Sequence, residues 1–175
     1  MNKDDNIFEE VVNSYYQSLY RFALTLTRSE SDAGDLTQSA FERLFRKPDQ
    51  LRDPSKAKTW LFTTLYRLFL EQRRRADRFP HVTVEDMDLP ASESDTTTPI
   101  DAEAVSSALA QLEEPFRAVL VLFYMEDHSY REIAAILGVP IGTVMSRLSR
   151  GKAMLRALLD EPASKIIPLP LKAAS

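Results

Sequence analysis

The chain has 175 residues, a net charge of −4, 44% hydrophobic residues and no cysteine. This length allows one domain or two small ones, and the lack of cysteine excludes disulfides, thiolate zinc sites and cysteine nucleophiles. No apolar run approaches the roughly 20 residues of a membrane span. The N-terminus also lacks an apolar signal core, so the expected compartment is the cytoplasm, without membrane insertion.

Charge is unevenly distributed along the chain. Residues 43–79 contain eleven Lys/Arg and four Asp/Glu, whereas residues 79–103 contain seven Asp/Glu and no Lys or Arg. A negative net charge alone argues against nucleic acid as a partner. The segregation instead predicts one surface that meets an anion and a separate acidic connector.

Residues 6–78 predict a first domain of three helices. The first helix carries an apolar stripe at helical spacing, made of Phe8, Val11, Val12, Tyr15, Leu19, Phe22 and Leu26. After a polar break at 29–31, a second helix is expected, with Asp32 and Asp35 in its first turn, where the helix dipole favours them. Pro48 is expected to end it, and Ser55 to cap a third helix that includes Trp60. Three such helices can form one small bundle.

Residues 79–100 combine prolines with acidic and hydroxyl residues and show no helical or strand period. They predict a flexible acidic linker. Residues 101–160 then predict a second small all-α domain of four helices, one of which opens at Pro115. Residues 161–175 contain three prolines and no periodic pattern, which predicts a flexible tail.

A helix-turn-helix is predicted at 129–155. Ser129 followed by Glu132 is a capping box, which marks a helix start. Gly138 suits the positive φ at a helix C-terminus, and Pro140 can stand at the start of the next helix. That second helix has one apolar stripe, made of Val144, Leu148, Gly151 and Leu155.

The second helix also has a polar face with Thr143, Ser146, Arg147 and Arg150 at helical spacing. Arginine can pair bidentately with guanine in the DNA major groove, and hydroxyls can reach bases or phosphates. The alternative is an amphipathic surface helix whose charges are only solvated. The capped helix pair and the segregated basic face favour DNA binding.

Aromatic and basic residues alternate from Lys56 to Arg78. The aromatic members are Trp60, Phe62, Tyr66 and Phe69. Such a stretch can bind single-stranded nucleic acid by stacking and charge neutralisation. The alternative is that the aromatic rings form the bundle core and the arginines complement a helix C-terminus.

No catalytic or metal site is predicted. The carboxylates around Asp32 have no neighbouring histidine, and His81 and His128 are isolated from each other and lack a third ligand. Four glycines in these positions make no phosphate-binding loop. We therefore expect no enzyme activity, no cofactor and no metal.

Two motifs in one order resemble a known family. The first is Asp32-Ala-Gly-Asp-Leu-Thr-Gln-Ser-Ala-Phe41, followed by Lys58-Thr-Trp-Leu-Phe-Thr-Thr-Leu65. The second runs from Ser129 to Arg147. Across an acidic linker, they resemble the extracytoplasmic-function (ECF) group of the sigma-70 family of bacterial RNA polymerase sigma factors.

The resemblance implies a role for each segment. The second helix matches the segment that grips core RNA polymerase, through Asp32, Asp35, Leu36, Phe41, Glu42 and Phe45. The segment from Leu51 to Arg75 matches the part that melts and captures the minus-10 promoter element, through Lys56, Lys58, Trp60, Arg67, Arg73 and Arg74. The recognition helix matches the reader of the minus-35 element, through Thr143, Met145, Ser146, Arg147, Ser149 and Arg150.

The resemblance thus implies an alternative sigma factor whose partners are core RNA polymerase, promoter DNA and an anti-sigma factor. Two other interpretations remain open. One is a helix-turn-helix transcriptional regulator that does not bind the polymerase clamp. The other is a small helical enzyme, which the missing catalytic residues disfavour.

Overall fold

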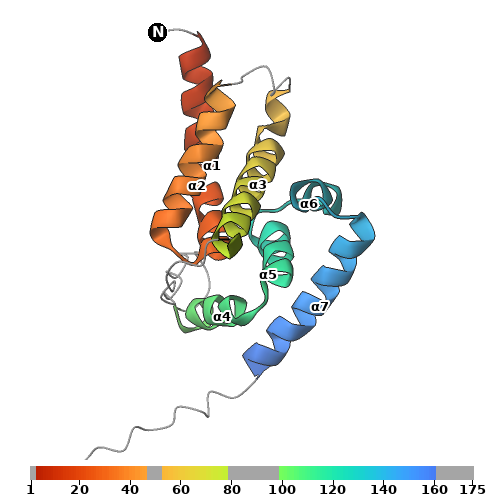
Figure 1. Cartoon of the computed structure of the whole chain (residues 1–175). Coiled ribbons are helices and arrows are strands. Elements are labelled where there is room, and N and C mark those ends of the chain that lie inside the picture. Colours follow the sequence, from red (N-terminus) through yellow and green to blue (C-terminus); the bar gives the residue numbers. More distant parts are fainter. Residues whose placement is uncertain (1–2, 47–52, 79–98, 161–175) are drawn as a thin grey trace, which may run out of the picture.

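The computed structural model describes residues 3–46, 53–78 and 99–160, and these residues form helices without any strand. The helices make two bundles that pack against each other (Figure 1). The predicted all-α fold is confirmed. The predicted linker and tail lie outside the described residues, apart from Pro99 and Ile100, which begin a helix of the second bundle.

The first bundle contains α1 (Lys3–Thr27), α2 (Glu30–Arg46) and α3 (Ala57–Arg78), with a short 3-10 turn, η2 (Pro54–Lys56), before α3. Apolar residues from all three helices meet in one core. Its largest fully buried members are Leu19, Phe22, Leu44, Leu61, Phe62 and Leu65. Burial of each such side chain contributes about 1.5–3 kcal/mol to folding, which holds α3 firmly against the other two helices.

The break between α1 and α2 is shorter than predicted. Arg28 has a left-handed backbone with φ of 55°, and the Ser29 hydroxyl accepts a hydrogen bond from the Asp32 backbone N–H at 3.3 Å. Because Ser29 caps the helix in this way, α2 already begins at Glu30. The first turn therefore holds Glu30 and Asp32, and the prediction that Asp35 lies in it was wrong.

The start of α3 also differs from the prediction that Ser55 is its cap. The Asp53 carboxylate accepts hydrogen bonds from the Ser55 backbone N–H at 3.0 Å and from its hydroxyl at 2.7 Å. Asp53 thus closes the 3-10 turn, and Ser55 lies inside it. These bonds lower the pKa of the Asp53 carboxyl.

The second bundle contains α4 (Pro99–Gln111), α5 (Glu114–Leu120), α6 (Tyr130–Leu137) and α7 (Ile141–Asp160). α5 has Pro115 in its first turn, as predicted, and continues into a π-helical turn, η3 (Val121–Met125). The wider turn is closed by the Glu126 backbone N–H, which donates to the Val121 carbonyl at 3.0 Å. The chain then leaves the helix at Asp127, whose φ is 55°.

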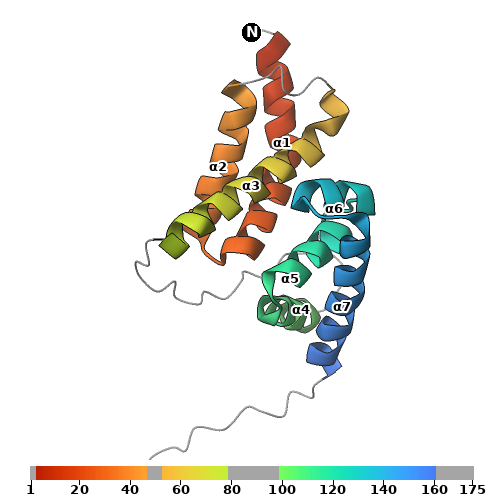
Figure 2. The same ribbon diagram turned by 45° about the vertical axis from the view of Figure 1, so that its right-hand side comes forward.

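The two bundles share an interface in which α6 lies beside α3 and α5 lies near the end of α1 (Figure 2). The Arg28 guanidinium donates to the Ala110 carbonyl of α4 across this interface. We call this packing of the two bundles the closed arrangement. A linked pair of independent domains, as the sequence suggested, would not by itself require such contacts.

Candidate nucleic-acid and partner interfaces

The helix-turn-helix has the local structure that its sequence predicts. The Ser129 hydroxyl accepts from the Glu132 backbone N–H at 3.3 Å, and the Glu132 carboxylate accepts from the Ser129 backbone N–H at 2.8 Å. Gly138 ends α6 with φ of 65°. α7 follows at a 101° bend, so the capping box and the left-handed glycine together fix the angle at which α7 leaves the bundle.

One face of α7 packs against α5. Val144, Leu148 and Gly151 are buried, and a Cβ atom at Gly151 would lie only 3.2 Å from Leu120 Cδ1. The missing side chain therefore lets the two helices approach closely, and it sets the position of α7 on the bundle.

The predicted base-reading face points away from this packing. Met145 is 53% exposed, and Ser146, Ser149 and Arg150 are also exposed, whereas Thr143 and Arg147 are half-buried. The Ser146 hydroxyl donates to the Thr143 carbonyl at 3.1 Å. Arg147 is near enough to α3 for its charge to oppose the rise in the pKa of Tyr66.

The aromatic residues of α3 divide into core and surface. Phe62, Tyr66 and Phe69 are buried, so the core interpretation holds for these three rings. Trp60 is half-buried and packs on the edge of the core. Of the aromatic residues singled out on α3, Trp60 is therefore the one with a ring partly available for stacking on a base.

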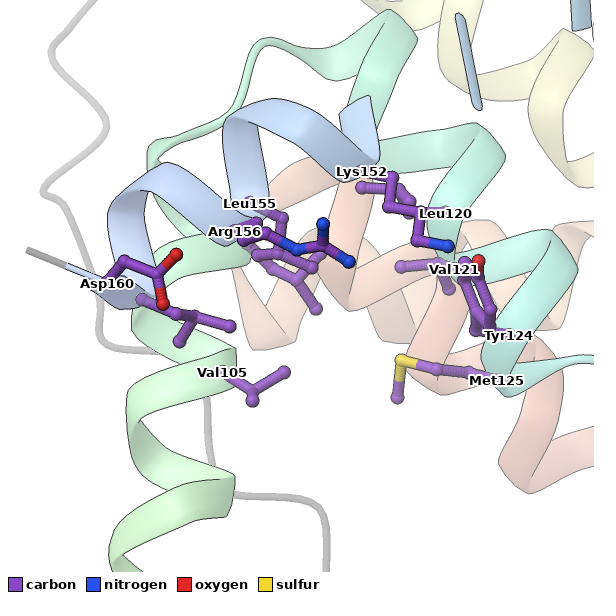
Figure 3. Close-up of a pocket in the computed structure, with 11 residues that line it drawn as sticks. Val105, Leu120, Val121, Tyr124, Met125, Lys152, Leu155, Arg156 and Asp160 are labelled. Carbon is purple, nitrogen blue, oxygen red and sulfur yellow. The ribbon is translucent and has the colours of Figure 1, made fainter. Parts of the chain in front are cut away.

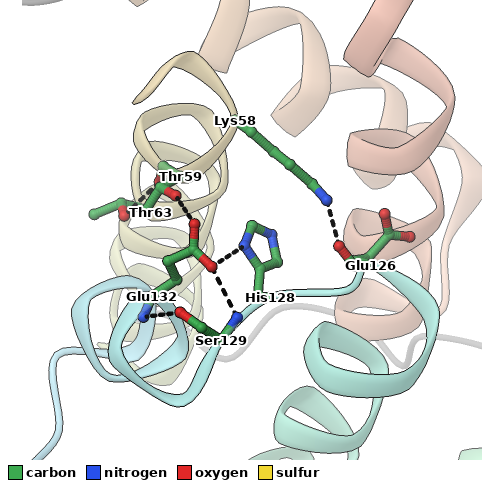
Figure 4. Close-up of polar contacts among 7 residues, drawn as sticks. All are labelled: Lys58, Thr59, Thr63, Glu126, His128, Ser129 and Glu132. Atoms are coloured by element: carbon green, nitrogen blue, oxygen red, sulfur yellow. Dashed lines mark hydrogen bonds and ion pairs between the residues drawn. The ribbon is translucent and has the colours of Figure 1, made fainter. Parts of the chain in front are cut away.

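The basic residues predicted to bind the minus-10 element lie in the same stretch of the chain as these aromatic residues. Lys56, Arg67, Arg73 and Arg74 are exposed, and Lys58 is half-buried. Two of these cations, Lys58 and Arg73, contact the second bundle. The Lys58 ammonium donates to the Glu126 backbone carbonyl (Figure 4), and Arg73 pairs with Glu114 at 3.3 Å.

Two neighbouring residues of α3 also bind glutamates of the second bundle. The Thr59 hydroxyl donates to Glu132 at 3.2 Å, and the Tyr66 hydroxyl donates to Glu114 at 2.9 Å. Burial, together with the proximity of the Glu114 carboxylate, raises the pKa of Tyr66. Carboxylates of the second bundle thus accept hydrogen bonds from side chains of α3 across the interface.

A buried polar pair lies at the centre of this interface. Glu126 and His128 are each 2% exposed. The His128 ring packs edge-on against Phe62, with centroids 4.8 Å apart, and its Nδ1 is 3.9 Å from Glu132 (Figure 4). Burial, together with the charge of Lys58, lowers the pKa of His128 to about 4, so His128 is neutral at pH 7.

The pKa of Glu126 is shifted in the opposite direction to that of His128. Burial raises the pKa of its carboxyl, and Ser18 and Arg21 of α1 partly offset this effect. The Arg21 guanidinium lies 3.7 Å from Glu126. Both buried groups therefore depend on the first bundle for their environment.

The predicted polymerase-binding residues lie on α2 in two layers. Asp35, Glu42 and Phe45 are exposed on one face, and Asp32 is half-buried. Leu36 and Phe41 are 5% and 4% exposed, so they anchor α2 in the core and are not available at the surface.

The exposed layer of α2 is held in place by its neighbours. Glu42 accepts from Gln38 at 3.1 Å and pairs with Arg46 at 3.7 Å. The Phe45 ring packs edge-on against Phe8, with centroids 4.8 Å apart. The exposed face of α2 therefore combines charges of both signs with an exposed apolar ring.

In the described ranges, no single helix has the length and apolar character of a membrane span; α6 and α7 reach that composition only together. Over the same residues, no three histidine or acidic side chains gather in a way that could hold a metal ion.

Comparison with known proteins agrees with this geometry. Residues 11–79 match Sigma-70 region 2, and residues 102–155 match Sigma-70, region 4. The ECF RNA polymerase sigma factor SigL of Mycobacterium tuberculosis is 34% identical over 148 residues, which cover 82% of this chain and 83% of SigL. The chain belongs to the ECF sigma factors.

A further ECF relative, SigE of Mycolicibacterium smegmatis, is 35% identical over 167 residues; the match covers 90% of this chain but only 63% of SigE. Among solved structures, the sigma factor RpoE of Bartonella quintana, determined with the anti-sigma factor NepR, has a TM-score of 0.75 at 29% identity. That match covers 89% of this chain and 98% of RpoE.

Three residues that matter in this sigma factor were not found from the sequence. Glu114, Glu126 and His128 were assigned no interaction, yet they make contacts between regions 4 and 2. No local pattern marks them, because their partners belong to another helix. Tyr66, the hydrogen-bond partner of Glu114, is 48 residues away in the chain, and Lys58, the partner of Glu126, is 68 residues away.

Proposed function

We propose that the chain is an alternative sigma factor that binds core RNA polymerase and directs it to a restricted set of promoters. The observation that carries this proposal is the pairing of two sigma regions in one chain, the second with a fully formed helix-turn-helix. As a non-enzymatic initiation factor, it would act in the cytoplasm, where the polymerase is.

In this proposal the exposed face of α2 binds the polymerase. Asp35 and Glu42 supply negative charge and Phe45 supplies an apolar contact beside them. Leu36 and Phe41 support this face indirectly, because their buried side chains hold α2 on the first bundle.

The two bundles divide the promoter between them. The face of α7 reads the minus-35 element in the major groove, with Arg150 and Arg147 as the residues able to pair bidentately with a base. The α3 surface captures the melted minus-10 element, with Trp60 as a stacking group and the exposed arginines on the backbone.

The closed arrangement is the form that the free protein takes in this proposal. Lys58 and Arg73 are held by Glu126 and Glu114, so the minus-10 surface is covered in part by the second bundle. DNA binding then requires the bundles to separate when polymerase binds. An anti-sigma factor would favour the closed form; the RpoE neighbour was solved with such a partner.

Transcription with purified core polymerase tests the proposal. Run-off transcripts from selected promoters are expected only when the chain is added to core enzyme. In gel-shift titrations at physiological salt, the free chain is expected to bind the same duplexes weakly. Tight, specific binding without polymerase, together with no transcript, would instead indicate a helix-turn-helix regulator.

A further inference from the structure

An apolar groove lies on the second bundle, beside the C-terminal half of α7. It has a volume of about 510 Å³ and is formed by α4, α5, η3 and the last turns of α7 (Figure 3). Its walls are mostly apolar. Three of the apolar side chains are open to solvent: Tyr124 is 58% exposed, Met125 42% and Leu159 41%. A cluster of large apolar side chains at this exposure indicates a binding surface.

The chain itself supplies a segment that can reach this groove. α7 ends at Asp160, which is itself one of the residues that line the groove. Five residues separate it from the run Ile166-Ile167-Pro168-Leu169-Pro170-Leu171. Residues 161–165 can span about 17 Å when extended, whereas the stretch of α7 from Lys152 to Asp160 is only about 12 Å long.

We infer that residues 166–171 of the same chain cover this groove, with Ile166, Ile167, Leu169 and Leu171 packed against it. The attachment point makes the contact intramolecular, so its effective concentration is on the order of millimolar. Pro168 and Pro170 restrict the backbone before binding, which lowers the entropy lost on docking. The alternation of proline with leucine also suits an extended segment laid along the groove.

This contact goes beyond the proposed function and does not depend on it. Its consequence is that the apolar side of region 4 is closed to other helices until the tail is displaced. Lys152 and Arg156 stand at the rim, so a partner segment with acidic flanks would have an electrostatic advantage over the tail, whose flanking residues are Lys165 and Lys172.

Disulfide trapping tests the contact directly, because the chain has no cysteine of its own. The test pair is Lys152→Cys with Lys172→Cys, which keeps all four apolar residues of the tail. The control pair is Ala157→Cys with Lys172→Cys. Ala157 is exposed, lies on the other side of α7 from Lys152, and is five residues nearer to Lys172 in the chain.

A freely moving tail would close the control pair at least as fast as the test pair, because the control pair is nearer in the chain. If the tail occupies the groove, oxidised glutathione is expected to close the test pair roughly ten times faster than the control pair. Replacement of the four apolar residues by serine should then lower the rate to that of the control. Intact-mass measurement distinguishes a bond within one chain from a bond between two.

Three outcomes would overturn the inference. Equal rates for the two pairs would show a tail without a preferred site, and a faster control pair would show the same. Disulfide-linked dimers at dilute protein concentration would show that a second copy, not the same chain, supplies the segment. Circular dichroism of each variant confirms that the bundle is folded, since the two substituted positions of α7 are exposed and the third lies in the tail.

Discussion

Glu114 contacts α3 across the closed arrangement, and one substitution tests how much this contact stabilises it. Glu114 is the acceptor for both the Tyr66 hydroxyl at 2.9 Å and the Arg73 guanidinium at 3.3 Å. Glu114→Ala removes both bonds at once. It also leaves the Tyr66 hydroxyl, which belongs to a residue only 6% exposed, without this acceptor while the bundles remain closed.

The expected magnitude follows from the two contacts. A hydrogen bond from Tyr66 to a carboxylate contributes about 1.5–3 kcal/mol. The pair with Arg73 adds little, about 0–1 kcal/mol, because the Arg73 side chain is 53% exposed and solvent screens it. A loss of about 2 kcal/mol shifts the balance between closed and open forms roughly thirtyfold toward the open form.

Fluorescence energy transfer measures this shift. Dyes on Ser14→Cys in α1 and Ala153→Cys in α7, both exposed positions, report the separation of the two bundles. Glu114→Ala should lower the transfer efficiency and strengthen binding of the free chain to single-stranded minus-10 DNA.

Glu113→Ala is the matched control, because Glu113 is exposed, adjacent to Glu114, and makes no side-chain cap bond to α5. It removes the same charge and is expected to leave transfer unchanged. If Glu114→Ala and Glu113→Ala give the same transfer and the same DNA affinity, the reasoning about this contact is refuted.

Three further predictions concern other parts of the molecule. The pKa of His128 is about 4 in the closed form against an ordinary 6.5, so between these values the open form binds a proton that the closed form does not. The contribution of neutral His128 to closure is therefore fully present above pH 6.5, and closure should weaken by about 1.4 kcal/mol at pH 5.5. At that pH, energy transfer should fall in wild type but not in His128→Gln. The raised pKa of Glu126 acts in the opposite direction, but this contribution is common to wild type and His128→Gln, so the difference between the two proteins reports His128. Gly151→Leu should lower the free energy of unfolding by about 1–3 kcal/mol through overpacking against Leu120, whereas Gly142→Leu, in open space on the same helix, should not; equal denaturation midpoints would contradict this packing. Asp35→Arg should weaken binding to core polymerase roughly tenfold while the fold is retained, and competition for core equal to wild type would show that this face of α2 is not the contact.

Local sequence signals predicted the helix-turn-helix closely. The capping box of Ser129 and Glu132 and the left-handed Gly138 involve residues that are neighbours in the chain, so their structure can be read from spacing. The same holds for the buried stripe of α7. Helix starts were less accurate where two hydroxyl or acidic residues compete, as at Ser29 and Asp53.

The closed arrangement could not be predicted from spacing. Tyr66 and Glu114 are separated by 48 residues, and nothing near either one indicates the other. The basic and aromatic stretch was ambiguous for a related reason: burial decides between core and stacking, and burial depends on which face of α3 meets α1 and α2. The structure assigned Phe62 to the core and left Trp60 at its edge.

The central claim is that the two bundles read different parts of one promoter, and promoter opening on paired templates tests it most directly. One template is duplex throughout, and the other is pre-melted over the minus-10 element. With core polymerase, a Trp60→Ala variant that is shown to be folded should be defective in opening the duplex template. The pre-melted template should rescue this defect. Arg150→Ala, which would lose the proposed base contact worth about 1–3 kcal/mol, should remain defective on both. Full rescue of Arg150→Ala by the bubble, with no rescue of Trp60→Ala, would contradict the account.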